Sequence, residues 1–213
     1  MKVSPAKENI LKKIRQALSH STPIPFPNSE GNSSVFRPST QDLEIEFAEQ
    51  FGKLQGKFVY CLNRGELLNQ LNALVSHNAW KEIFCCERNV KDLLGGLQSN
   101  RFSEQGLEIC DAAITTCEAL IARTGSIVLS AAQESGRTVS VYAPVHICIA
   151  FTRQLVYDIK DGLQLIKDKY GPNIPSLISF ATGPSRTADI EKTLVVGVHG
   201  PKEVYLFLVD ESI

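Results

Sequence analysis

The sequence lacks any run of about 20 consecutive apolar residues, the length that a membrane-spanning helix needs. It also lacks an excess of charge of either sign, because 22 Lys and Arg residues stand against 23 Asp and Glu residues. This balance argues against broad electrostatic binding to nucleic acid. Residues 1–18 are charged and lack the apolar centre of a signal peptide. We therefore expect a cytoplasmic protein that neither spans a membrane nor binds nucleic acid.

Several familiar catalytic motifs are missing as well. The sequence contains no phosphate-binding GxxxxGK[S/T], no dinucleotide-binding GxGxxG, no GxSxG of serine hydrolases and no HExxH of zinc peptidases. No motif for a recognisable cofactor is present. The six cysteines form no CxxC pair and no close Cys/His group, which iron–sulfur and structural zinc sites usually show. We expect them to be reduced and mostly buried, and we expect no metal site.

The N-terminal part of the chain differs in composition from the rest. Residues 5–19 predict an amphipathic helix with a basic side, and the next 20 residues are rich in proline. Because the helix is short and has no large aromatic anchors, we favour docking on its own domain or a neighbouring subunit over binding to a membrane. We divide the chain into this helix and arm, residues 1–39, through which copies could associate, and an α/β domain, residues 40–213.

Expected helices and strands alternate after residue 40. Helices are predicted at 41–54, 64–76, 89–94, 116–122 and 158–170, and strands at 58–61, 82–86, 107–110, 126–130, 145–151, 155–157, 177–181 and 203–209. The last strand is apolar throughout, which is typical of a sheet covered on both faces. We therefore predict an α/β fold with a largely parallel sheet and helices on both faces. In such folds ligands bind at the carboxyl ends of the strands.

The segment 182–191 is the first candidate site, because it follows an expected strand. Its Gly-Pro pair predicts a turn, and the residues after the turn could cap a new helix whose free amide groups attract an anion. An arginine there could bind a carboxylate or phosphate. The alternative is a capped helix with no ligand. The candidate ligand-binding residues are Gly183, Ser185, Arg186 and Thr187, and the acids Asp189 and Glu191 are candidates for catalysis.

Three other places combine small or polar residues with expected strands. His199 lies between two glycines, where it is either an acid–base or anion-binding group or simply a turn residue. The run Thr124, Gly125 and Ser126 could let a ligand approach the backbone, or could only join a helix to a strand. His146 begins an apolar strand and is more typical of a core residue than of a ligand-binding residue. Further candidates are Arg137, for the ligand, and Glu118, for catalysis.

Two ordered segments carry a resemblance to a known family. Residues 183–191 (GPSRTADIE) and 197–201 (GVHGP) resemble the C-terminal signature of the LUD domain of the lactate-utilization LutC/YkgG family, and residues 121–126 and 144–147 agree further. The resemblance implies an α/β fold similar to the NagB/RpiA/CoA-transferase group. It also implies a role in oxidising L-lactate to pyruvate beside two partner subunits, one of which carries iron–sulfur clusters. Arg123 departs from the pattern, since the family commonly has an acid there.

We therefore expect a non-redox component of an L-lactate oxidation system that binds a small anion or an anionic cofactor. The expected cleft is formed by Ser185, Arg186, Thr187 and His199 at the carboxyl ends of strands. Two alternatives stay open. The first is a stand-alone enzyme of the sugar-phosphate isomerase or CoA-transferase type, which needs a catalytic carboxylate. The second is a structural or regulatory subunit that acts through residues 1–39.

Overall fold

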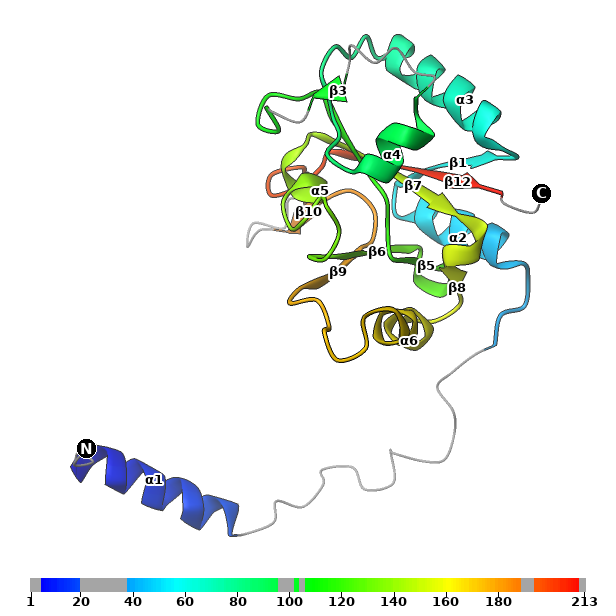
Figure 1. Cartoon of the computed structure of the whole chain (residues 1–213). Coiled ribbons are helices and arrows are strands. Elements are labelled where there is room, and N and C mark those ends of the chain that lie inside the picture. Colours follow the sequence, from blue (N-terminus) through cyan, green and yellow to red (C-terminus); the bar gives the residue numbers. More distant parts are fainter. Residues whose placement is uncertain (1–4, 20–37, 96–101, 104–105, 189–193, 211–213) are drawn as a thin grey trace. The chain divides into compact units, whose positions relative to one another are not determined.

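The structure is a computed structural model of the 213-residue chain, and it describes residues 5–19, 38–95, 102–103, 106–188 and 194–210. The chain divides into two compact units, residues 1–38 and 39–213. The described part of the first unit is the helix α1 (Pro5–Leu18), which confirms the helix expected there (Figure 1). Among the described residues, no helix has the length and apolar character needed to cross a membrane.

The second unit is built around a six-stranded sheet in which every neighbouring pair of strands is parallel. In spatial order its strands are β1 (Lys57–Cys61), β12 (Glu203–Val209), β7 (Val145–Phe151), β4 (Ala112–Thr115), β2 (Ile83–Phe84) and β3 (Phe102–Ser103). The central strands are apolar at nearly every position because both of their faces are buried. The parallel sheet predicted from the sequence is confirmed.

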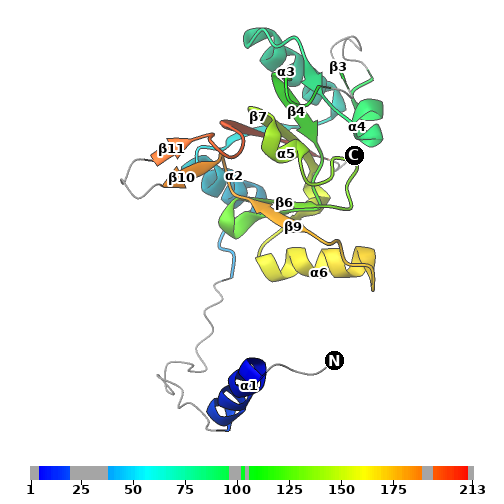
Figure 2. The same ribbon diagram turned by 90° about the vertical axis from the view of Figure 1, so that its left-hand side faces the viewer.

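Different elements cover the two faces of this sheet. One face carries α3 (Arg64–His77) and α4 (Arg88–Leu93), and side chains such as Phe207 of β12 pack into this layer. The opposite face, which holds Leu206 and Leu208, carries α2 (Leu43–Lys53) and a second sheet. That sheet has the order β8 (Leu155–Val156), β5 (Ala119–Ile121), β6 (Ser126–Ser130) and β9 (Ile178–Ala181). The helix α6 (Ile159–Tyr170) closes its outer face, as Figures 1 and 2 show.

The remaining elements are short. The helix α5 (Val139–Tyr142) precedes β7, and the 3-10 turns η2 (Ala122–Thr124) and η3 (Thr152–Gln154) connect strands. The hairpin β10 (Arg186–Ala188) and β11 (Leu194–Val196) forms a separate two-stranded sheet. The helix α6 begins at Asp158, whose carboxylate accepts from the amide of Lys160, and it ends at Gly171 with φ 53°.

Three local predictions are wrong. The expected strand at 107–110 is a turn, and the expected helix at 116–122 is a loop followed by β5. Every residue of β5 is fully buried, and periodicity alone does not separate a short buried strand from a buried helix. The helix expected after Gly183 and Pro184 is the strand β10, because its backbone pairs with β11 instead of with itself. No helical amide groups are therefore available at that turn.

Candidate functional site

The main sheet has a topological switch point between β2 and β4. After β2 the chain passes through α4 on one face of the sheet, and after β4 it passes into the second sheet on the opposite face. Connections that leave two neighbouring strands in opposite directions open a crevice at the carboxyl ends of those strands. The residues that follow β2 and β4 are therefore the first place to look for a ligand site.

A cavity of about 510 Å³ lies at this edge of the sheet. Thr116, Cys117 and Glu118 line it after β4, and further lining comes from the end of β7, from α4 and from α6. The polar side chains contributed by these other elements are Arg153, Gln154, Asn89 and Lys169. Several elements far apart in sequence thus supply one polar cavity, and its volume lies in the range typical of small-molecule sites.

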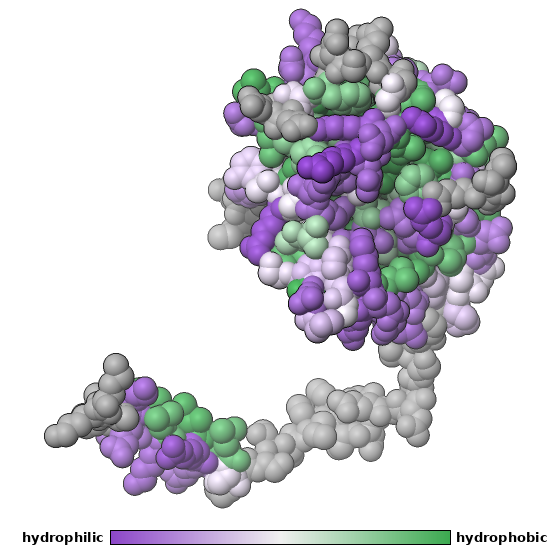
Figure 3. Space-filling model, in the orientation of Figure 1, coloured by the Kyte–Doolittle hydropathy of each residue, from purple (hydrophilic) through white to green (hydrophobic). Residues whose placement is uncertain are grey.

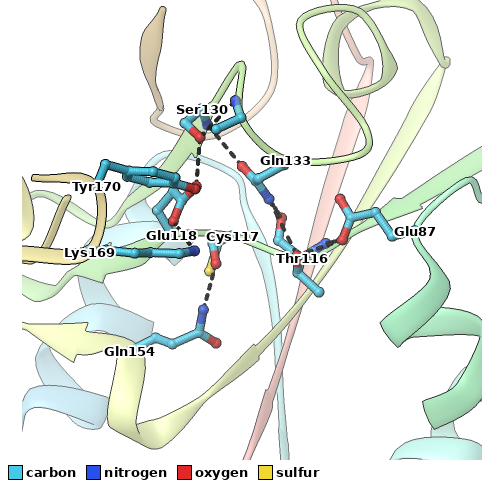
Figure 4. Close-up of polar contacts among 10 residues, drawn as sticks. Glu87, Thr116, Cys117, Glu118, Ser130, Gln133, Gln154, Lys169 and Tyr170 are labelled. Atoms are coloured by element: carbon cyan, nitrogen blue, oxygen red, sulfur yellow. Dashed lines mark hydrogen bonds and ion pairs between the residues drawn. The ribbon is translucent and has the colours of Figure 1, made fainter. Parts of the chain in front are cut away.

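Glu118 is the most tightly bonded group in the cavity (Figure 4). Its Oε1 accepts from the hydroxyls of Ser130 at 2.6 Å and Tyr170 at 2.7 Å, and its Oε2 accepts from Lys169 Nζ at 2.7 Å. Burial would raise the pKa of Glu118, but these three hydrogen bonds and the charge of Lys169 outweigh burial and place the pKa below its ordinary value. The carboxylate is therefore ionised at neutral pH, with donors on both oxygens.

Lys169 of α6 forms the ion pair with this carboxylate. Burial would lower the pKa of Lys169, but the hydrogen bond to Glu118 and its negative charge raise the pKa overall. The side chain of Lys169 is 60% exposed, whereas that of Glu118 is 2% exposed. The lysine consequently keeps its charge and presents part of its ammonium group to the opening of the cavity.

A second polar cluster lies beside the first, at the switch point itself. Glu87, which follows β2, accepts at Oε2 from the amide of Thr116 at 2.9 Å and from its hydroxyl at 2.5 Å. Gln133 supports the same segment by donating from Nε2 to the carbonyl of Thr116 at 3.0 Å (Figure 4). Glu87 is only 4% exposed, and its Oε1 is buried without a hydrogen-bond partner. The ends of β2 and β4 are thus joined by a carboxylate with unused acceptor capacity.

The third side of the cavity is fixed by Gln154. Its Nε2 donates to the carbonyl of Cys117 at 2.5 Å, and its Oε1 accepts from the amide of Phe151 at 2.8 Å. The neighbouring Arg153 lies over the ring of Phe151, with 5.0 Å between the guanidinium carbon and the ring centroid. Gln154 therefore ties the end of β7 to the loop after β4, and it holds the backbone of Cys117 in place.

All six cysteines are free, and five of them are buried, which agrees with the role predicted for them. Cys117 lines the cavity and forms a side-chain hydrogen bond with the fully buried Cys148. Burial first, and then this hydrogen bond, raises the pKa of the Cys148 thiol well above its ordinary value. A protonated thiol is a poor nucleophile, so Cys148 is not an activated nucleophile.

The charged lining of the cavity is suited to an anion. Two cationic side chains, Arg153 and Lys169, stand against the single carboxylate of Glu118, which already accepts three hydrogen bonds. A ligand carboxylate or phosphate could therefore bond to these cations while Glu118 keeps its own hydrogen bonds. Because donors occupy both oxygens of Glu118, the arrangement favours binding and positioning over attack by this carboxylate.

Of the expected anion cleft, the structure brings the segment of Ser185 beside the segment of His199, at another edge of the molecule. The amide of Ser185 donates to the carbonyl of Pro201 at 2.9 Å, so the segment after β9 meets the segment before β12. Residues 197–202 precede β12 and therefore lie at the amino end of the parallel sheet. Ser185 and Arg186 follow the carboxyl end of β9, as predicted, but β9 belongs to the second sheet and His199 precedes β12, so the cluster does not lie at the carboxyl ends of the parallel strands.

His199 lines a separate cavity of about 430 Å³ at that amino edge, together with Tyr142, Pro144 and Lys202. Arg186 turns to another partner and donates to the carbonyl of Leu54 at the end of α2. Gly183 has φ 84°, and a Cβ atom there would lie 2.6 Å from the same carbonyl. The turn at Gly183 is thus explained by close packing against α2.

The other candidate residues have structural partners. Thr124 and Ser126 form a hydroxyl pair at 2.7 Å, and a Cβ on Gly125 would lie 2.5 Å from the amide nitrogen of Phe51. The exposed Arg137 donates to Ser176 at 2.6 Å. Arg123 pairs with Asp158 at 2.6 Å; although burial would raise the pKa of Asp158, the Lys160 amide and then Arg123 lower it overall. The side chain of Thr187 and the residues Asp189 and Glu191 lie outside what the structure describes.

His146 is a core residue, as its apolar setting predicted. It is 0% exposed, and its Nε2 lies 2.8 Å from the hydroxyl of Thr115, which itself donates to the carbonyl of Thr116 at 2.9 Å. This arrangement favours the tautomer in which Nε2 donates to Thr115, and Nδ1 is buried without a partner. Burial lowers the pKa of His146 to about 4, so the ring is neutral at physiological pH.

Sequence reasoning missed most of the cavity at the carboxyl ends. Of its polar lining groups only Glu118 was a candidate, whereas Asn89, Thr116, Arg153, Gln154 and Lys169 were not, and neither was Glu87, which bonds to Thr116. Glu87 could have been found, because it follows the apolar run at 82–86 directly. Lys169 could not, because the charged face of an amphipathic helix gives no sign of which lysine turns toward a cavity.

The fold defines an α/β protein with a polar cavity at the switch point of a parallel sheet. The family model of the LUD domain matches residues 98–209, more than half of the chain, and the chain belongs to the LUD domain family. A solved structure of a DUF162 family protein from Deinococcus radiodurans has the same fold. Its TM-score is 0.61 at 17% identity, over 81% of this chain and 99% of that one.

Curated relatives match part of the chain. Lactate utilization protein C of Bacillus licheniformis is 37% identical over 109 residues, which are 50% of this chain and 45% of the relative. The protein of the same name from Shouchella clausii is 36% identical over 120 residues, 54% of this chain and 52% of the relative. The chain spans about half the length of the curated relatives it matches.

Proposed function

We propose that this chain is a component of a lactate-utilization system and that it binds a small anion, or an anionic cofactor, in the cavity at the carboxyl ends of β4 and β7. The names of its relatives, Lactate utilization protein C, support the first part of the proposal. The position of the cavity at the switch point of the sheet supports the second part.

The observation that carries the anion proposal is the balance of charge in the cavity lining. Arg153 and Lys169 are both cationic, and the one lining acid, Glu118, is already bonded to Lys169, Ser130 and Tyr170. A carboxylate ligand could accept further hydrogen bonds from these two cations. A volume of about 510 Å³ is more than a three-carbon acid needs, which leaves space for a larger anionic cofactor.

The role that we propose for this chain is non-redox. Its lining groups are ion-pair and hydrogen-bond partners: two cations, a fully bonded carboxylate, an amide that fixes the loop and a buried thiol. Such groups bind and orient an anion. Electron transfer would belong to partner subunits that carry iron–sulfur clusters, as the family resemblance implies.

Ligand binding tests the site. Isothermal titration calorimetry on the full chain with L-lactate, pyruvate, phosphate and coenzyme A should detect binding of at least one of these anions. Arg153→Gln and Lys169→Met should each weaken that binding by about tenfold or more, since a charge-assisted hydrogen bond contributes about 1.5–3 kcal/mol. Lys167→Met, which removes an exposed lysine from the same helix, is the matched control and should bind as wild type. Absence of binding by all four anions would remove the anion proposal.

Growth of a deletion strain on L-lactate tests the proposed role in lactate utilization. Deletion of the gene in its native host should impair growth on L-lactate as the sole carbon source but not on glucose. Complementation with wild type should restore growth, whereas Arg153→Gln should restore it less well. If the deletion strain grows normally on L-lactate, the proposed role in lactate utilization is wrong even if the cavity binds anions.

A pull-down tests the partners. The tagged chain, used as bait in lysate of lactate-grown cells, should recover proteins that show the absorbance of iron–sulfur clusters. Recovery of the bait alone, from cells in which such clusters are abundant, would contradict the proposed division of labour between subunits.

A further inference from the structure

The helix α1 carries an apolar stripe that is exposed among the described residues of its unit. Ile10, Leu11, Ile14 and Leu18 are between 37% and 79% exposed, and they form the apolar band that Figure 3 shows along this helix. Four basic residues and one acidic residue give the helix a net charge of +3. A single helix of 14 residues is marginally stable in water. Packing of its apolar stripe against another surface would therefore stabilise it.

A groove with an apolar floor and acidic side chains lies in the second unit, between α2 and the edge strand β1. Its volume is about 480 Å³, and its apolar lining is Ile45, Ala48, Phe58 and Tyr60. Ile45 is 51% exposed although it is a large apolar side chain. The strand β1 stands at the end of the six-stranded sheet, so its outer side has no neighbouring strand among the described residues. The groove is an uncovered apolar surface beside a free sheet edge.

The rim of the groove is acidic. Asp42, Glu44 and Glu49 line it, and the described lining contains no basic side chain. Three carboxylates around an apolar floor match a helix that has an apolar stripe and a net charge of +3. The positions of the charges also match. Lys13 and Arg15 each lie about 100° from Ile14 around the helix, so they flank the apolar stripe on both sides, as the carboxylates flank the apolar floor of the groove.

We propose that the groove between α2 and β1 binds the helix α1 of a second copy of this chain. Each copy has one such helix and one such groove, so two copies can exchange helices reciprocally and the assembly closes as a two-fold dimer. Both contacts then form together, and each raises the effective concentration for the other. Twenty residues separate Leu18 from Ser39. Because an extended chain spans up to about 3.3–3.6 Å per residue, this segment is long enough to reach a neighbouring copy.

Charge reversal on the full-length chain tests the contact. Sedimentation equilibrium at chain concentrations between about 1 and 100 µM measures the dimer dissociation constant, and this range spans ordinary dimer affinities. Wild type should be a dimer. Lys13→Glu with Arg15→Glu should raise the dimer dissociation constant by about tenfold or more, and so should Glu44→Lys with Glu49→Lys. A chain that carries all four changes should recover the dimer, because the charges then match again.

Matched variants separate this contact from general effects of charge. Lys12→Glu lies on the side of α1 opposite Ile14, and Asp168→Lys lies on α6, so neither should change the dissociation constant. Ile14→Asp should abolish the dimer, whereas Gln16→Asp, on the far side of the same helix, should preserve it. Circular dichroism checks that each variant is folded.

A cross-link identifies the occupant directly. A photoreactive benzoylphenylalanine replaces Ile14, and chains labelled with ¹⁴N and ¹⁵N are mixed before irradiation. Peptides that join α1 to residues 42–60 and carry both labels would support exchange between copies. Cross-links confined to one label would mean that the helix docks on its own chain, and a monomer with no cross-link to residues 42–60 would mean that the groove binds something else. Either result overturns the proposal.

Discussion

The guanidinium of Arg186 donates to the carbonyl of Leu54, the residue that ends α2, with 2.5 Å between the two atoms. Carbonyl groups at a helix end have no partner within the helix, and a cation there also interacts favourably with the helix dipole. Arg186 thus acts as a cap for α2, 132 residues away in sequence.

Arg186→Ala should therefore lower the free energy of unfolding by about 0.5–1.5 kcal/mol. Urea denaturation at pH 7 measures this loss. The exposed Arg88→Ala is the control and should change stability by less than about 0.5 kcal/mol. If Arg186→Ala leaves stability unchanged but weakens anion binding, then the arginine serves a ligand and not the helix.

Glu118→Gln should destabilise the protein at neutral pH by about 1–3 kcal/mol, because the amide replaces a buried carboxylate that accepts three hydrogen bonds. The pKa of Glu118 lies below its ordinary value of 4.5 in the folded protein. Its contribution is therefore complete above that value and is lost as the pH falls through the lower folded pKa. The difference between wild type and Glu118→Gln should shrink below about pH 4.5, and a difference independent of pH would contradict the assignment. The exposed Glu108→Gln serves as the control.

Gly125→Ala should be strongly destabilising for two reasons. Gly125 has φ 59°, and a Cβ atom there would lie 2.5 Å from the amide nitrogen of Phe51 in α2. Gly136 has nearly the same backbone, with φ 63°, but no atom within 4 Å of its Cβ position. Gly136→Ala should therefore cost only about 1–2 kcal/mol for the backbone, and Gly125→Ala should cost clearly more. Equal melting temperatures for the two variants would exclude the close approach of α2.

Thr116→Val should destabilise the protein by about 1–3 kcal/mol, since it removes the hydroxyl that donates to Glu87 and leaves a buried carboxylate less well bonded. Thr116→Ser retains the donor and should lie close to wild type. Thermal unfolding of the two variants makes the comparison. If Thr116→Val unfolds at the same temperature as wild type, the hydrogen bond to Glu87 does not stabilise the fold and this account of the cluster is wrong.

The sequence was sufficient for the architecture where periodicity was strong. The apolar strand at 203–209 and the amphipathic helix at 64–76 were both recognisable, because burial on two faces and burial on one face leave different patterns. Local pattern failed at 116–122 and after Gly183. In both places the segment is only three residues long and pairs with the next strand of the chain, and so short a segment shows too little periodicity to separate a strand from a helix.

The site was harder to predict than the fold. Gly125 and Gly183 looked like ligand-binding glycines, but the nearest atoms to both belong to α2, so close packing of the backbone explains them. Lys169 and Glu118 are 51 residues apart and meet only because α6 closes the outer face of the second sheet. A charge pair of this kind depends on tertiary structure, and one sequence alone does not contain it.

Calorimetric titration of a small anion into four variants tests the central claim most directly, with L-lactate and pyruvate as the probes. If the cavity at the carboxyl ends of β4 and β7 is the binding site, Arg153→Gln and Lys169→Met weaken binding by about tenfold or more. His199→Ala, in the cavity at the amino edge, and Arg186→Ala, beside the end of α2, then bind as wild type. The reverse pattern, with affinity lost at Arg186 or His199 and retained at Arg153 and Lys169, would place the ligand at the other edge of the sheet and contradict this account.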